Sequence, residues 1–135
     1  HKLVNEASLW PGGKFVTTNS VVSPSVLKAH ASVVSDLLKA NIESVNYINK
    51  NTSAAETAAN AELTTLLGKG LKTAALAASF QQITFTVDPI ASSLATDAKH
   101  AQAVGLLKPV NLNGIYDLGP LNTLLKADGE AQVSP

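Results

Sequence analysis

Two short stretches of this chain alternate apolar and polar residues, and each leads directly into a helix start signal. Residues 14–22 run KFVTTNSVV and residues 82–87 run QITFTV. Such alternation, rich in β-branched side chains, predicts a strand. The first stretch ends at Ser23 and the second at Asp88, and a proline follows each, as expected for an N-cap before the first helical position. The chain is therefore expected to pass twice from a strand into a helix.

Helical periodicity fills most of the remaining sequence. The longest apolar stripe runs from Val26 to Ile48 and contains His30, which we interpret as a packed side chain. In the next helix, Glu56 is placed for a capping box and Gly68 for a C-terminal cap. Four shorter helices are expected, over residues 54–67, 72–80, 89–104 and 120–126.

The spacing of these elements predicts the fold class. Strands separated by so much helix cannot pair as hairpins, so the expected fold is α/β and helix-rich, with two to three strands in a mainly parallel or mixed sheet. The third strand candidate is the short fragment Leu3–Glu6. So few strands make a poor sheet for these helices to cover, and the chain is expected to be part of a longer protein.

Composition excludes several classes of function. Ten basic and ten acidic residues cancel, without a cluster of either sign, so nucleic acid is not expected as a partner. The absence of cysteine excludes disulfides, thiolate catalysis and thiolate-bound metals. The three histidines have no metal-ligand spacing, and no catalytic motif surrounds any serine. Neither a catalytic site, a metal site nor a cofactor is expected.

What remains is binding of a small ligand. Trp10, the single tryptophan, precedes the turn sequence Pro-Gly-Gly. It is either an aromatic cap over the edge of the domain or one wall of a ligand pocket. The run Thr17-Thr18-Asn19-Ser20 offers four small hydrogen-bonding side chains without charge. That run is either the solvent-exposed face of an edge strand or a row of hydrogen-bonding groups that binds a polar ligand.

Several segments resemble a known protein family. LWPGGKFVTTN, LKAH, VVSDLLKA, ITFTVDPIASSL, AVGLL and LNGIYDL follow one another in the order seen in the C-terminal part of ABC-importer solute-binding proteins of the sulfonate/nitrate/taurine class. The resemblance extends over nearly all of residues 1–135. It implies a type II periplasmic-binding-protein fold, with residues 1–135 forming the C-terminal segment of a two-lobed protein, mostly its first lobe with an incomplete sheet.

The resemblance also implies a function and a site. The protein would capture a small anion or aliphatic sulfonate in a cleft between two lobes by hinge closure, without catalysis. Trp10, Thr17, Thr18 and Asn19 would line that cleft. Because no acidic residue lies between Trp10 and Pro24, this segment is not expected to partner a ligand amine. Two alternatives stay open: an enzyme on the same fold, of the thiamine-precursor or menaquinone biosynthesis type, and a standalone helical interaction domain.

The expected partners follow from the same resemblance. They are the small anionic or sulfonate ligand, an ABC permease in the membrane, and the missing N-terminal part of the same protein. Exposed strand edges predict self-association. The location implied is periplasmic or extracellular, with a lipid anchor on the full-length precursor left open.

Overall fold

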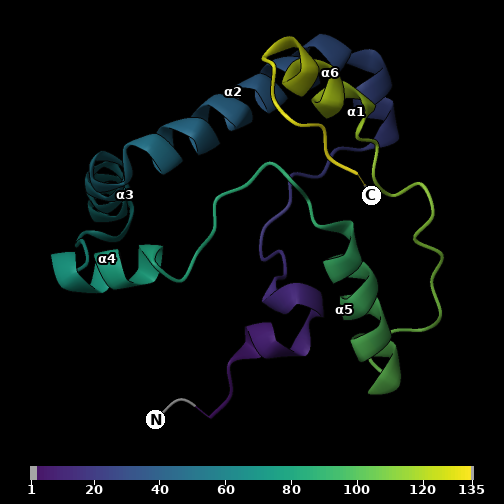
Figure 1. Cartoon of the computed structure of the whole chain (residues 1–135), viewed down its shortest axis with the longest axis horizontal. Helices are drawn as coiled ribbons and strands as arrows, with labels where there is room; N and C mark the ends of the chain where they lie inside the picture. The colour runs from purple at the N-terminus through teal and green to yellow at the C-terminus, as the bar shows by residue number, and fades with distance from the viewer. Residues whose placement is uncertain (1–2, 135) are drawn as a thin grey trace. The chain divides into compact units, whose positions relative to one another are not determined.

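A computed structural model describes residues 3–134, and the regular structure in that range is entirely helical (Figure 1). Two 3₁₀ turns lie near the N-terminus, and six α-helices follow. Their bounds are η1 Glu6–Leu9, η2 Pro11–Gly13, α1 Pro24–Ala29, α2 Ala31–Lys50, α3 Thr52–Leu67, α4 Thr73–Phe80, α5 Ala91–Ala103 and α6 Gly119–Ala127.

The predicted α/β class, a fragment of a type II periplasmic-binding-protein fold with two to three strands, is wrong. Between residues 3 and 134 no strand forms, including at 14–22 and 82–87. A strand requires a neighbouring strand to pair its backbone groups. In each of these two stretches, a side chain instead pairs one of the backbone groups. The Val16 N–H donates to the Ser93 hydroxyl at 3.2 Å, and the Phe85 carbonyl accepts from the Asn49 amide at 3.2 Å.

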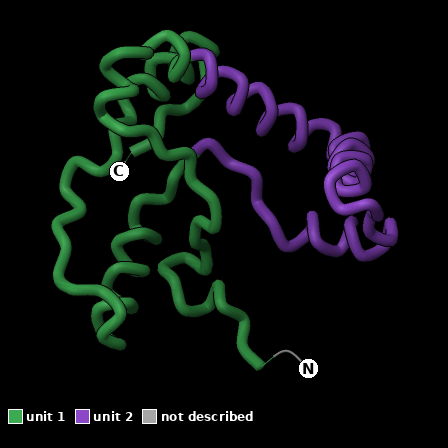
Figure 2. Tube along the Cα trace, turned by 180° about the vertical axis from the view of Figure 1, so that it is seen from behind, with its two compact units in different colours: residues 1–35, 88–135 green, residues 36–87 purple. Residues whose placement is uncertain are grey.

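The described chain divides into two compact units (Figure 2). Unit 1 takes residues 1–35 and 88–135, and unit 2 takes residues 36–87. The two stretches expected to be strands therefore fall in different units, 14–22 in unit 1 and 82–87 in unit 2.

In unit 1, the start of α1 confirms the predicted capping signal. The Ser23 hydroxyl accepts the Val26 N–H at 3.3 Å, and Pro24 takes the first helical position. The expected single helix is instead divided at His30, whose backbone leaves the helical region at φ −134° and ψ 43°. Beyond this kink α2 continues to Lys50.

The second capping signal of unit 1, at Asp88, forms a turn before α5 and not the predicted N-cap. The Asp88 carboxylate accepts the N–H of Ile90 at 2.8 Å, two residues on, and so closes an Asx turn. Ile90 adopts a left-handed backbone with φ 43°, which delays the start of α5 to Ala91. The predicted helix over residues 89–104 is confirmed, and the predicted cap at Asp88 is wrong.

The C-terminal part of unit 1 is anchored on α6. Leu121 and Leu125 are buried, with Leu125 fully inaccessible. The Asn122 side chain binds the backbone of Val133 twice, donating to its carbonyl and accepting from its N–H, each at 2.9 Å. The chain that follows α6 is thereby held against this helix.

Unit 2 contains α3, α4 and the larger part of α2. Its buried apolar side chains are Ile42, Ala55 and Leu76, one from each helix. The end of α3 at Gly68, which adopts φ 74°, confirms the predicted C-terminal cap. The predicted capping box with Glu56 is wrong, because the N-cap residue of α3 is Asn51 and its side chain makes no capping bond.

None of the described helices combines the length and the apolar character needed to cross a membrane.

Candidate functional site

Trp10 is positioned by two consecutive tight turns. Its backbone N–H donates to the Ala7 carbonyl at 3.2 Å, and its own carbonyl accepts from Gly13 at 3.0 Å. Gly12 and Gly13 both adopt positive φ, 65° and 68°, a region that glycine enters without the steric cost of a Cβ. The turns formed by the sequence Trp-Pro-Gly-Gly therefore set the backbone position from which the Trp10 side chain extends.

The indole lies against α5, far along the chain. Its Nε1–H donates to Oδ1 of Asp97 at 2.7 Å, a short bond strengthened by the charge of the carboxylate. The His100 ring meets Trp10 edge-on, with centroids 5.3 Å apart and planes at 70°. Asp97 and His100 lie three residues apart, so they share one face of α5.

The segment that follows Trp10 lies along the same face of α5. Phe15 stacks on the indole, with centroids 4.6 Å apart and planes at 26°. Next along the chain, the Val16 N–H binds the hydroxyl of Ser93, which is only 1% exposed. Ser93, Asp97 and His100 are spaced i, i+4, i+7 and form one stripe, as helical periodicity requires.

Tyr116 adds a polar group beside this stripe. Its hydroxyl is buried and has no hydrogen-bond partner among the described residues. Burial raises the pKa of Tyr116 above its ordinary value of 10.0, and the negative charge of Asp97 raises that pKa further. The hydroxyl is therefore protonated at neutral pH and is a free donor. Leaving such a group unpaired costs about 1–3 kcal/mol.

We name this set the Trp10 cluster. It comprises two residues from the N-terminal segment, two from α5 and one from the loop before α6: Trp10, Phe15, Asp97, His100 and Tyr116.

Of the four residues predicted to contact ligand, only Trp10 belongs to the cluster. Thr17, Thr18 and Asn19 are exposed on the irregular segment between Phe15 and α1. The hydrogen bonds and ring contacts that join the N-terminal segment to α5 come from residues before them.

Sequence reasoning missed Ser93, Asp97, His100 and Tyr116. The buried side chains of α5 are Ser93 and Ala98, whereas Val104, just beyond the helix, is 70% exposed. The available signal was the i, i+4, i+7 spacing of three polar residues. Nothing in the sequence connected that stripe to Trp10, more than eighty residues earlier.

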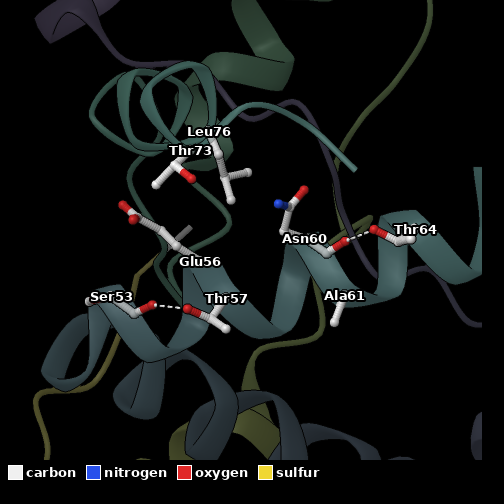
Figure 3. Close-up of a pocket in the computed structure, with 8 residues that line it drawn as sticks. All are labelled: Ser53, Glu56, Thr57, Asn60, Ala61, Thr64, Thr73 and Leu76. Atoms are coloured by element: carbon white, nitrogen blue, oxygen red, sulfur yellow. Dashed lines mark hydrogen bonds between the residues drawn. The ribbon is translucent and has the colours of Figure 1, made fainter. Parts of the chain in front are cut away.

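A second candidate is a groove between α3 and α4 in unit 2, with a volume of about 330 Å³ (Figure 3). The polar groups lining it already serve the local structure. The Thr57 hydroxyl donates to the Ser53 carbonyl at 3.0 Å, and the Thr64 hydroxyl donates to the Asn60 carbonyl at 2.7 Å. The Asn60 side chain binds both backbone groups of Leu71. This groove therefore offers fewer free groups to a ligand than its composition suggests.

No set of three His, Cys, Asp or Glu side chains suited to a metal ion is found among residues 3–134. Comparison with known proteins adds no relative: no family model, no curated protein and no solved structure matches the chain.

Proposed function

We propose that this chain is the C-terminal part of an extracytoplasmic solute-binding protein that serves an ABC importer. Its ligand is a small anion or aliphatic sulfonate, and it binds without catalysing a reaction. The proposal rests on the order of the sequence segments named above and on the Trp10 cluster.

One observation carries the proposal. Trp10, one of the residues that the family resemblance assigns to ligand contact, also binds a distant segment of unit 1. A hydrogen bond to Asp97 and stacking on Phe15 hold the indole in place. A fixed aromatic side chain loses little conformational entropy when a ligand binds, and therefore favours binding. Near Asp97, the buried hydroxyl of Tyr116 has no hydrogen-bond partner among the described residues.

The partners and the location belong to the same proposal. The missing N-terminal part of the protein supplies the remainder of the cleft, and closure of that cleft is stabilised by the ligand's higher affinity for the closed form. The loaded protein then meets an ABC permease at the membrane, in the periplasm or outside the cell.

Calorimetry on the intact precursor tests this function. We expect binding of an alkanesulfonate or of nitrate, and a change in the fluorescence of Trp10, the only tryptophan here. The variant Trp10→Phe keeps an aromatic ring but removes the indole N–H, and should bind more weakly. Absence of heat and of fluorescence change with both ligands would refute the proposal. For residues 1–135 alone we expect weak binding or none.

A second candidate function, a helical interaction domain, is favoured by one specific observation. Residues 15–22, expected to be a strand, form none. An autonomous helical domain should unfold cooperatively as the isolated 135-residue chain, with an unchanged melting temperature when the N-terminal part is added. A solute-binding protein should instead gain stability from that addition. Thermal unfolding followed by circular dichroism therefore separates the two functions.

A further inference from the structure

We infer that α5 has two alternative starting points, Ala91 as in this structure and Pro89 two residues earlier, and that Ile90 switches between them. In the short form of the helix Ile90 has a left-handed backbone, and in the long form it becomes helical. This inference concerns a conformational change within unit 1 and does not depend on the proposed function.

The backbone of Ile90 is in an unfavourable conformation. Between residues 3 and 134, it is the only residue other than glycine with a positive φ. Its φ of 43° and ψ of 66° place it in the left-handed region, where the Cβ of an L-residue comes too close to the following carbonyl oxygen. This crowding disfavours the left-handed form by about 5- to 30-fold relative to the right-handed helix. The short form of α5 is kept in spite of that cost.

The residues just before Ile90 already suit a longer helix. Proline is favoured at the first helical position, which Pro89 would take, because its missing N–H and fixed φ carry no penalty there. Asp88 would then be the N-cap residue, whose side chain accepts the N–H of the second or third helical residue. The Asp88 carboxylate already accepts the Ile90 N–H at 2.8 Å, so the same hydrogen bond serves both forms.

The two forms differ in the hydrogen bonds of the first turn of the helix. In this structure the Ser93 N–H donates to the Ile90 carbonyl, three residues earlier, at 2.8 Å. In the long form, the regular α-helical pattern would give the Ser92 N–H an acceptor four residues earlier, the carbonyl of Asp88. Protection of the Ser92 N–H from solvent exchange therefore reports on the long form.

The switch lies next to a contact that holds the N-terminal segment on α5. The Ser93 hydroxyl accepts the Val16 N–H at 3.2 Å, and Ser93 is only 1% exposed. In the long form the N–H of Ser93 would exchange its acceptor at Ile90 for the carbonyl of Pro89. A change of form therefore alters the helical turn from which the contact with Val16 is made.

Two variants at residue 90 test the inference on the 135-residue chain. Ile90→Gly removes the steric cost of the left-handed backbone and should fix the short form. Ile90→Ala keeps that cost and favours the helix, so it should shift the equilibrium toward the long form. From Ile90→Gly to Ile90→Ala we expect the ratio of long to short form to rise more than about tenfold. Both variants lack the isoleucine side chain, so its loss cancels in the comparison.

Nuclear magnetic resonance of the first turn provides the readout. Amide exchange at Ser92 should be slowest in Ile90→Ala, where a nuclear Overhauser contact between Pro89 Hα and the Ser92 N–H should also appear. Ala91→Gly is the matched control, because residue 91 is helical in both forms, and it should leave the ratio of the two forms near that of the wild type. Equal exchange of the Ser92 N–H in the two residue-90 variants would overturn the switch.

A measurement on the unmodified protein keeps the test independent of whether a variant folds. Relaxation dispersion detects exchange between conformations on the microsecond-to-millisecond timescale. We expect such exchange at the amides of residues 90–93 in the wild-type protein, and we expect Ile90→Gly to abolish it. A flat dispersion profile across residues 90–93 of the wild type would overturn the inference.

Discussion

The candidate sites of the two units differ in the partners of their polar side chains. In unit 1, hydrogen bonds join residues far apart in sequence, such as Trp10 with Asp97 and Val16 with Ser93. In unit 2, hydroxyls lining the groove mostly bind the carbonyl four residues earlier, as Thr57 binds that of Ser53. Such local bonds satisfy the hydroxyl, but they do not hold any residue of another segment in place. Polar residues therefore mark a candidate site only where their partners are distant.

The largest expected effect concerns the core of unit 1. Leu125 is 0% exposed, so Leu125→Ala should lower the free energy of unfolding by about 2–5 kcal/mol through lost burial and a new cavity. The matched change Leu66→Ala removes a side chain that is 70% exposed on α3, and should stay within about 0.5 kcal/mol. Urea unfolding of both variants provides the comparison. Similar losses would show that α6 does not supply a core.

An intermediate effect is expected in unit 2, where the Asn60 side chain binds the backbone of Leu71, 11 residues further along the chain. A Cβ on Gly70 would lie 2.7 Å from Oδ1 of Asn60, an atom that accepts the Leu71 N–H. Gly70→Ala should therefore cost about 1–3 kcal/mol through overpacking.

A double-mutant cycle sharpens this prediction. Asn60→Ala removes two hydrogen bonds to Leu71 and should itself cost about 1–3 kcal/mol. It also removes two of the three atoms that crowd Gly70, those of Asn60, and leaves the Thr64 hydroxyl at 2.7 Å. The two changes together should therefore cost less than their sum. Strict additivity in chemical unfolding would show that Asn60 does not hold the loop.

The smallest expected effect compares the two tyrosines, one in each unit. The folded-state pKa of Tyr116 is raised, so its stabilising contribution is present below pH 10 and is lost as pH rises through the folded pKa. Tyr116→Phe should flatten this alkaline loss, and near pH 7 should be neutral or stabilising because it removes an unpaired hydroxyl.

The control for this variant is Tyr47→Phe, which removes a hydroxyl from an exposed residue of unit 2. Near pH 7 it should change the free energy of unfolding by less than about 0.5 kcal/mol. Stability curves measured between pH 7 and pH 11 that coincide for wild type and Tyr116→Phe would contradict the account of the buried hydroxyl.

The sequence was sufficient to locate the helices because most of their signals are local. The cap at Ser23 and the stop at Gly68 depend on residues within a few turns of one another, whereas the stripe from Val26 to Ile48 did not reveal the break at His30. The strands were predicted wrongly because alternation indicates only an extended chain, whereas a strand requires a partner. The residues at 14–22 have that alternation but no neighbouring strand in the described chain.

The candidate site could be predicted only in part, for a related reason. Trp10 was found because it is unique in the chain and precedes a turn. Asp97 was not, because its partner lies 87 residues away and the polar stripe on α5 resembles an ordinary solvated face. Contacts between distant segments depend on packing, which local patterns do not report.

The most direct test of the Trp10 cluster is the indole N–H itself, which gives a single resonance because the chain has one tryptophan. We expect this proton to exchange with solvent more slowly than that of a free indole, since it donates to Asp97 at 2.7 Å. In Asp97→Ala the protection should disappear, while Asp97→Asn should retain part of it. An indole N–H that exchanges at the free rate in the wild-type protein would contradict the cluster and the site built on it.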